Sequence, residues 1–118
     1  MKQTPLKRRV PISKKGRKGK GAIGENEVRD ILIAHGYLGC RRNFASGGYG
    51  GGDLIGVPGY SIEVKRHETT KPWEWYEQAK EAASPTETPV VAFRRSRSPW
   101  MALLSLEDLL GLMEASQL

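Results

Sequence analysis

Two acids and a lysine are grouped around a predicted β-hairpin between residues 52 and 66. Asp53 stands at the start of the first strand, and Glu63 and Lys65 lie two positions apart on the second. Because strand side chains alternate between faces, Glu63 and Lys65 are expected to project together. Carboxylates suit a divalent cation such as Mg²⁺, and a lysine ammonium can hold a water or offset phosphate charge. The pattern therefore indicates a metal site acting on a phosphodiester, although a solvated strand face with a surface ion pair gives the same short motif.

Glycine and proline mark the connections on both sides of Asp53. Residues 57–60, Val-Pro-Gly-Tyr, place Pro and Gly at the favoured central positions of a type II turn. The glycine-rich loop before Asp53 spans residues 45–51. It is either a flexible connection or a segment whose bare backbone approaches a bulky ligand, and its place beside the acids favours the second reading.

A predicted helix over residues 22–35 must position a further acid. Its apolar residues recur at helical spacing, and Gly36 is well placed as the stop. Glu25 lies at the margin of the apolar face of this helix. We therefore expect Glu25 to complete or support the site of Asp53 and Glu63.

The remaining pattern predicts a small α/β domain with a mixed central sheet. A first strand is expected over residues 37–44, before the hairpin. Pro72 opens a helix capped by Thr70 that ends near Ala83, and a parallel strand follows at residues 89–94 through a right-handed crossover. A final strand at 100–104 leads into a helix that starts at Ser105. The predicted order is α-β-β-β-α-β-β-α.

Two sets of apolar residues in these helices need a packing partner. Trp73, Trp75 and Tyr76 are most simply core or subunit-interface residues, with stacking on nucleic-acid bases as the less favoured alternative. The last helix is amphipathic, and its apolar residues are Leu106, Leu109, Leu110 and Met113.

The net charge of +6 is unevenly distributed along the 118 residues. Residues 1–20 contain nine bases and no acid, whereas the rest of the chain has ten bases and all 13 acids, a net charge of −3. We therefore expect 1–20 to be a disordered basic arm and 21–118 to be one folded domain. Such an arm suits a polyanion, with a solubilising or targeting role as the alternative. Its glycines and lysines do not form a P-loop, because Ala22 follows Gly21 and no strand precedes the segment.

Composition restricts the compartment and the chemistry. No apolar run approaches the roughly 20 residues that span a bilayer, and the N-terminus lacks the apolar segment of a secretory signal. The single cysteine, Cys40, excludes an internal disulfide and a cysteine-based zinc site within one chain. These features predict a soluble protein of the cytoplasm, or of a host's cytoplasm for a viral protein.

The acids and the lysine also carry a family resemblance. Glu25, Asp53 and the run 63–65, Glu-Val-Lys, resemble the signature of the PD-(D/E)xK nuclease superfamily, and the order of elements matches its core. More narrowly, about residues 20 to 106 resemble the archaeal-type Holliday junction resolvases. The matching positions are Lys20-Gly21-Ala22-Ile23-Gly24-Glu25, Arg42, Ser46, Gly52-Asp53-Leu54-Ile55, Ile62-Glu63-Val64-Lys65, Gln78, Pro89-Val90-Val91-Ala92 and Trp100.

The resemblance implies a restriction-endonuclease-like domain and a homodimer. Such a dimer places two Mg²⁺-dependent sites across a four-way DNA junction and cuts two strands symmetrically, with Mn²⁺ able to substitute. Glu25, Asp53 and Glu63 then take the metal-site roles and Lys65 that of the catalytic lysine. The candidates for DNA contact are Lys20, Arg41, Arg42, Ser46, Arg66 and Arg94, of which Arg42 and Ser46 are expected near the scissile phosphate.

The sequence departs from the resolvase pattern at three places, of which the first is tolerated at its position and the other two bear on the contacts with DNA. Gly52 stands where the superfamily's name has proline, Asn26 stands where many resolvases have arginine, and loop 45–52 is long and rich in glycine. Two alternatives therefore stay open beside junction resolution: a related nuclease acting on branched, damaged or duplex-end DNA, and a non-catalytic DNA-binding module.

Overall fold

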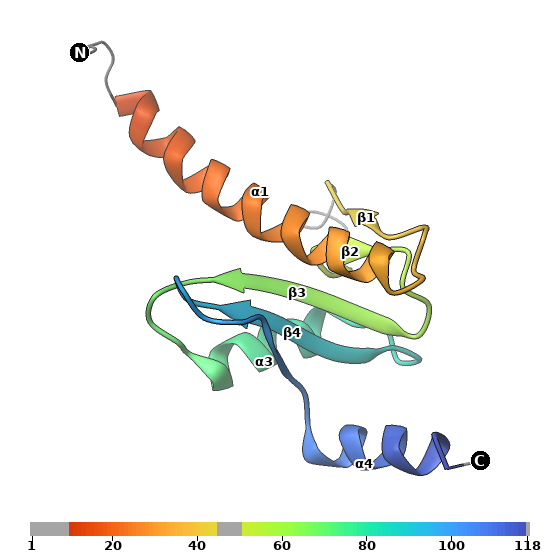
Figure 1. Cartoon of the computed structure of the whole chain (residues 1–118). Coiled ribbons are helices and arrows are strands. Elements are labelled where there is room, and N and C mark those ends of the chain that lie inside the picture. Colours follow the sequence, from red (N-terminus) through yellow and green to blue (C-terminus); the bar gives the residue numbers. More distant parts are fainter. Residues whose placement is uncertain (1–9, 45–50, 118) are drawn as a thin grey trace.

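The computed structural model describes residues 10–44 and 51–117, with the backbone alone for residues 10–20. Its elements are α1 (Val10–Ala34), β1 (Arg41–Arg42), β2 (Leu54–Ile55), β3 (Tyr60–Arg66), α3 (Pro72–Ala82), β4 (Thr88–Arg94), β5 (Met101–Leu103) and α4 (Leu106–Ala115). Helix α1 crosses one face of the sheet, α3 lies on the other face, and α4 stands apart (Figure 1). The predicted α/β class and element order are confirmed.

Within the described residues the sheet has five strands, in the order β1-β2-β3-β4-β5. Strands β3 and β4 are parallel, and α3 forms the crossover between them, whereas the other neighbouring strands are antiparallel. This is the predicted mixed sheet. The first strand is shorter than predicted, because only Arg41 and Arg42 of the segment 37–44 pair with β2. No helix among the described residues is long and apolar enough to cross a membrane.

The hairpin turn forms as predicted. The amide of Tyr60 donates to the carbonyl of Val57 at 3.1 Å, and Gly59 has a φ of 87°. A positive φ at the third residue is what a type II turn requires and what glycine permits. The turn sets Leu54 opposite Ile62 in the antiparallel pair of β2 and β3.

Helix α1 starts earlier than the sequence predicts. It begins at Val10 rather than Ala22, so residues 10–20 are helical where no stable structure was expected. Pro11 lies in the first turn, where it is tolerated, and the lysines and arginines that follow are good helix formers. At the other end Gly36, with a φ of 106°, stops the helix as predicted. Residues 1–9 lie outside the described part, and the division into an arm and a domain stays a prediction.

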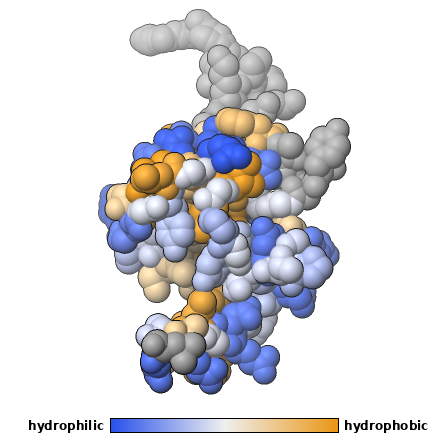
Figure 2. All heavy atoms as spheres, turned by 90° about the vertical axis from the view of Figure 1, so that its right-hand side faces the viewer, coloured by the Kyte–Doolittle hydropathy of each residue, from blue (hydrophilic) through white to orange (hydrophobic). Residues whose placement is uncertain are grey.

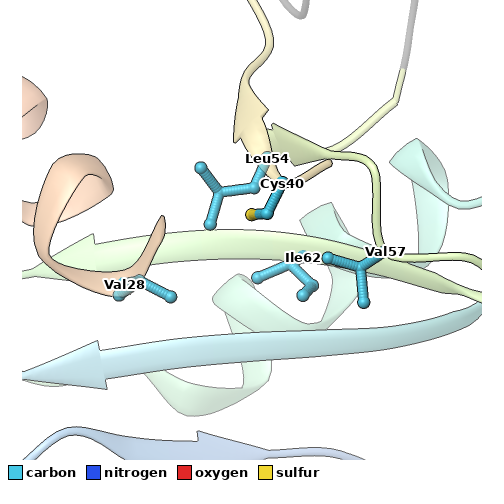
Figure 3. Packing of buried hydrophobic residues seen from close by; sticks show 5 residues of the cluster. All are labelled: Val28, Cys40, Leu54, Val57 and Ile62. Carbon is cyan, nitrogen blue, oxygen red and sulfur yellow. The ribbon is translucent and has the colours of Figure 1, made fainter. Parts of the chain in front are cut away.

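Two apolar clusters hold the layers together. Val28 of α1 packs with buried Cys40, Leu54, Val57 and Ile62 on one face of the sheet (Figure 3). On the other face, Trp75 and Ala79 of α3 pack with Val91 of β4. Burial raises the pKa of the Cys40 thiol despite nearby Arg29 and Arg41, so this thiol is a packing residue rather than a nucleophile.

The predicted cap of α4 is present in the structure, whereas the predicted cap of α3 is not. The hydroxyl of Ser105 accepts from the Asp108 amide at 3.0 Å, so the predicted cap of α4 is confirmed. Helix α3 begins with Lys71 at the capping position and without a side-chain cap, so the Thr70 prediction is wrong. The capping position falls on Lys71, one residue after Thr70, and a lysine side chain has no acceptor for the amides of the first turn.

Candidate active site

Asp53 is fixed to β3 through both its backbone and its carboxylate. Its amide donates to the Ile62 carbonyl at 2.8 Å, and its carbonyl accepts from the Asn43 amide at 2.9 Å. One carboxylate oxygen, Oδ2, accepts from the Val64 amide at 2.8 Å, so a side chain replaces a backbone carbonyl in the sheet ladder. The Val64 amide thus holds the Asp53 carboxylate in place through Oδ2.

Glycine at position 52 is what allows this approach to β3. A Cβ on Gly52 would lie 2.5 Å from the carbonyl oxygen and 2.7 Å from the amide nitrogen of Ile62. The Gly52 carbonyl also accepts from the Asn43 side chain at 3.0 Å. Proline, which carries a Cβ, would therefore clash at position 52 in this chain, and glycine fits there.

We expect Gly52→Ala to move Asp53 away from its position. The added methyl overlaps the β3 backbone, which cannot rotate aside as a side chain could, and overpacking of this kind costs about 1–3 kcal/mol. Urea unfolding should show the loss, and metal binding at Asp53 should weaken in parallel. Gly21→Ala is the matched control, because a Cβ there meets nothing within 4 Å and favours the helix. Equal stability of the two variants would contradict the close approach at Gly52.

Glu63 lies beside Asp53 and carries a strongly shifted pKa. Burial raises the pKa of Glu63 to about 8, and a hydrogen bond with Asp53 and the charge of Asp53 act in the same direction. The charge of Lys65 lowers it, and that of Glu25 raises it slightly. Two carboxyls that share a proton in this way form a pair that a divalent cation can occupy in place of the proton.

Glu63 and Lys65 project from the same face of β3, as predicted. In the parallel ladder Glu63 is the partner of Val91 and Lys65 that of Phe93, both of which pack toward α3. Ile62 and Val64 instead pack toward α1. Lys65 is half-buried.

Glu25 is brought to the edge of this site but has a different first partner. Its Oε1 accepts from Nε of Arg42 at 2.8 Å, and both side chains are mostly buried. Among the described residues no group of three or more His, Cys, Asp or Glu side chains is arranged to hold a metal ion. The structure thus brings together Asp53 and Glu63 as a pair, and it does not show the predicted three-carboxylate metal site.

The carboxyl pair nevertheless fits a hard divalent cation. Magnesium needs only one or two protein carboxylates, because it retains waters and takes further oxygens from a phosphate. Both acids offer oxygen ligands, and a bound cation would offset the burial and the repulsion from Asp53 that together raise the pKa of Glu63. Asp53 and Glu63 are therefore the residues that would hold it.

The residues expected to contact DNA are dispersed around the site. Arg41 is exposed and donates to the Gly39 carbonyl at 3.0 Å, and the guanidinium of Arg42 lies 4.8 Å from the Phe44 ring centre. Arg66 has a buried Nε without a hydrogen-bond partner among the described residues. The side chain of Lys20 and the whole of Ser46 lie outside the described residues.

One ion pair was not anticipated from the sequence. Glu27 accepts from Nη1 of Arg94 at 3.2 Å and from the indole of Trp100 at 3.0 Å, which ties α1 to the far side of the sheet. The guanidinium of Arg94 also lies 5.7 Å from the Trp100 ring centre. Arg94, a candidate for DNA contact, thus has a structural partner. No local pattern reveals it, because the partners are 67 and 73 positions apart.

Comparison with known proteins identifies a family. The model of a family described as "Phage putative PDDEXK endonuclease" matches residues 16–117. Searches of curated proteins and of solved structures found no match. The matched range contains α1 from residue 16 onward, the whole sheet and the Asp53–Glu63 pair.

Proposed function

This chain belongs to the phage PDDEXK endonuclease family, and on this premise we propose that it hydrolyses DNA phosphodiester bonds with a divalent metal ion. The observation that carries the proposal is the carboxyl pair of Asp53 and Glu63, in which burial, together with the hydrogen bond and the charge of Asp53, raises the pKa of Glu63 to about 8. Two partly buried acids side by side are costly for folding unless a cation binds there.

The metal ion, Mg²⁺ or Mn²⁺, would be held by Asp53 and Glu63. When bound, it supplies a more acidic water and neutralises charge that grows on the phosphate. The Val64 amide holds the Asp53 carboxylate in place through Oδ2. Lys65 places its ammonium group beside Glu63, where it can orient a water and offset the developing negative charge.

The ion pair of Glu25 and Arg42 has a supporting role in this proposal. Glu25 engages Nε of Arg42, which leaves the two terminal nitrogens of the guanidinium as donors for a phosphate oxygen. Glu25 thereby fixes the direction of Arg42 rather than binding the metal directly. This assigns Arg42 to the phosphate that flanks the cut.

The finer proposal is that a homodimer resolves four-way DNA junctions by symmetric cuts. Its support is the resemblance of residues 20–106 to the archaeal-type resolvases, above all at Glu25, Asp53, Glu63 and Lys65. Cutting of branched, damaged or duplex-end DNA is supported equally by the family match. A non-catalytic DNA-binding module is less favoured, because the two acids and the lysine are all present.

One assay separates these possibilities. Purified protein is incubated with a labelled four-way junction and a duplex of matched sequence, with and without Mg²⁺. Paired cuts in the junction alone support resolution, and equal cutting of the duplex supports a broader nuclease. Binding without cutting at every Mg²⁺ and Mn²⁺ concentration overturns the nuclease proposal.

We expect the basic N-terminal arm to strengthen DNA binding without taking part in the chemistry. Residues 1–18 contain eight bases, and each phosphate neutralised steepens the dependence of log affinity on log salt by about 0.9. Deletion of 1–18 should therefore weaken binding and flatten the salt dependence in filter-binding titrations. The cutting rate at saturating DNA should not change. An unchanged salt slope would show that the arm does not contact DNA.

A further inference from the structure

Helix α4 carries an apolar stripe that its own domain leaves exposed. Leu106, Leu109, Leu110 and Met113 follow the helical spacing of three and four residues, and they are 68%, 41%, 44% and 49% exposed. Among the described residues α4 has no buried side chain. In Figure 1 the helix stands away from the sheet, and Figure 2 shows it as a separate lobe with apolar surface where it joins the domain.

A helix in this position needs a packing partner. Ser105 caps α4 and acids occupy its first turn, and both features stabilise the start of a helix. Isolated helices shorter than about 12–15 residues are nevertheless only marginally stable in water. Most helical stability in proteins comes from burying the apolar stripe. The 10 residues of α4 therefore gain their stability from a surface that covers the stripe.

An apolar groove adjoins the start of the stripe. It has a volume of about 370 Å³ and lies between α3 and the end of β5, with Leu106 of α4 forming part of its wall. Its other lining residues are Pro72, Trp73, Tyr76, Leu103, Leu104 and Ser105. Trp73 is 84% exposed, so a large aromatic side chain stands open at its rim. The stripe and the groove thus form one continuous apolar surface.

The charge on α4 excludes DNA as the partner of this surface. The helix contains three acids, Glu107, Asp108 and Glu114, and no base. Phosphate would be repelled, and an apolar stripe offers it no hydrogen bond. An apolar protein surface fits both the stripe and the acids beside it.

The size of the surface matches one half of a protein dimer. With about 200 Å² for a fully exposed large apolar side chain, the four stripe residues and Trp73 present on the order of 600 Å². A standard interface buries about 800 Å² on each partner, of which roughly two thirds is apolar in homodimers. A two-fold axis lets the same patch cover itself.

We propose that two copies of this chain associate through the α4 stripe and the adjoining groove, an inference that rests on the homodimer in the proposed function. The stripe of each copy packs against the same surface of the other. The acids of α4 remain in solvent at the edge of the interface. Asp53, Glu63 and Lys65 are not among the residues that line this groove, so the proposed interface uses a different set of side chains from the candidate active site.

Light scattering on the purified full chain across a concentration series tests this surface. The unchanged protein should be a dimer at micromolar concentration. Leu110→Glu places a charge in the interface on both copies and should raise the dissociation constant by at least about 100-fold. Gly111→Glu adds the same charge on the opposite side of α4, where a Cβ meets no neighbour, and should leave the dimer intact.

Separate measurements of folding and of DNA cutting distinguish a lost interface from an unfolded or inactive protein. Near-ultraviolet circular dichroism of the buried Trp75 reports whether Leu110→Glu keeps its fold. A wild-type monomer at every concentration, or an intact Leu110→Glu dimer, overturns the interface even if the protein cuts DNA. A dimer lost in Leu110→Glu but without metal-dependent cutting in the wild type upholds the interface and refutes the nuclease proposal instead.

Discussion

Asp53→Asn should abolish metal-dependent cutting while leaving the fold intact. The asparagine oxygen can still accept the Val64 amide, and its nitrogen can donate to Glu63, so both contacts of the aspartate have a replacement. What is lost is the second negative charge that a divalent cation requires. Loss of residues that merely support a metal ligand costs roughly 10–100-fold, so loss of a ligand itself should exceed about 100-fold in the cutting rate.

The measurement is single-turnover cutting at saturating DNA, together with urea unfolding of the same preparation. Asp30→Asn makes the same chemical change at an exposed acid that pairs with neighbouring Arg29 at the surface, and it should keep full activity. Substantial turnover by Asp53→Asn would remove Asp53 from the proposed site. Loss of activity accompanied by unfolding would assign Asp53 a structural role only.

Glu63→Gln should remove both the metal response and a pH dependence of stability. The folded-state pKa of Glu63, about 8, lies above its ordinary value of 4.5. Between these values the folded state therefore binds more protons than the unfolded state, so this residue's contribution to stability is complete below pH 4.5 and is lost as the pH rises through about 8. Glutamine resembles the protonated acid and has no proton to lose.

Metal-free unfolding at about pH 5 and about pH 9 measures this contribution. The wild type should lose stability between the two values, and Glu63→Gln should lose much less. Added Mg²⁺ should restore wild-type stability at the higher pH, since the ion replaces the proton, and should leave Glu63→Gln unchanged. Glu74→Gln, at an exposed acid, is the control and should behave as the wild type. Identical pH profiles for wild type and Glu63→Gln would contradict the shared proton with Asp53.

Local physics explains the parts of the structure that were predicted from the sequence. The alternation of side chains along one strand puts Glu63 and Lys65 on the same face. The positive φ of Gly59 and the hydroxyl of Ser105 fix a turn and a helix start within four residues of themselves. The parallel pairing of β3 and β4 follows from the helix between them.

Contacts between distant residues decided what the sequence left open. Glu25 was expected beside Asp53 and Glu63, but the packing of α1 against β1 gives it Arg42, 17 positions away, as its partner. A helical pattern specifies which face of a helix is buried, and it does not specify which charge will stand opposite a residue at the margin. The structure therefore places Glu25 in an ion pair with Arg42 at the edge of the Asp53–Glu63 pair, and its role toward a metal ion stays a prediction.

The sequence by itself determined the acids, the lysine and the strands that carry them, because these depend on residue type and spacing along one element. Only the tertiary structure showed that Gly52 must lack a Cβ, since the atoms it would meet belong to Ile62 on the next strand. The same holds for α4: its spacing predicted an amphipathic helix, and only the arrangement of the domain shows that the apolar stripe is left uncovered. Burial is a property of all the elements together, so no single stretch of sequence contains it.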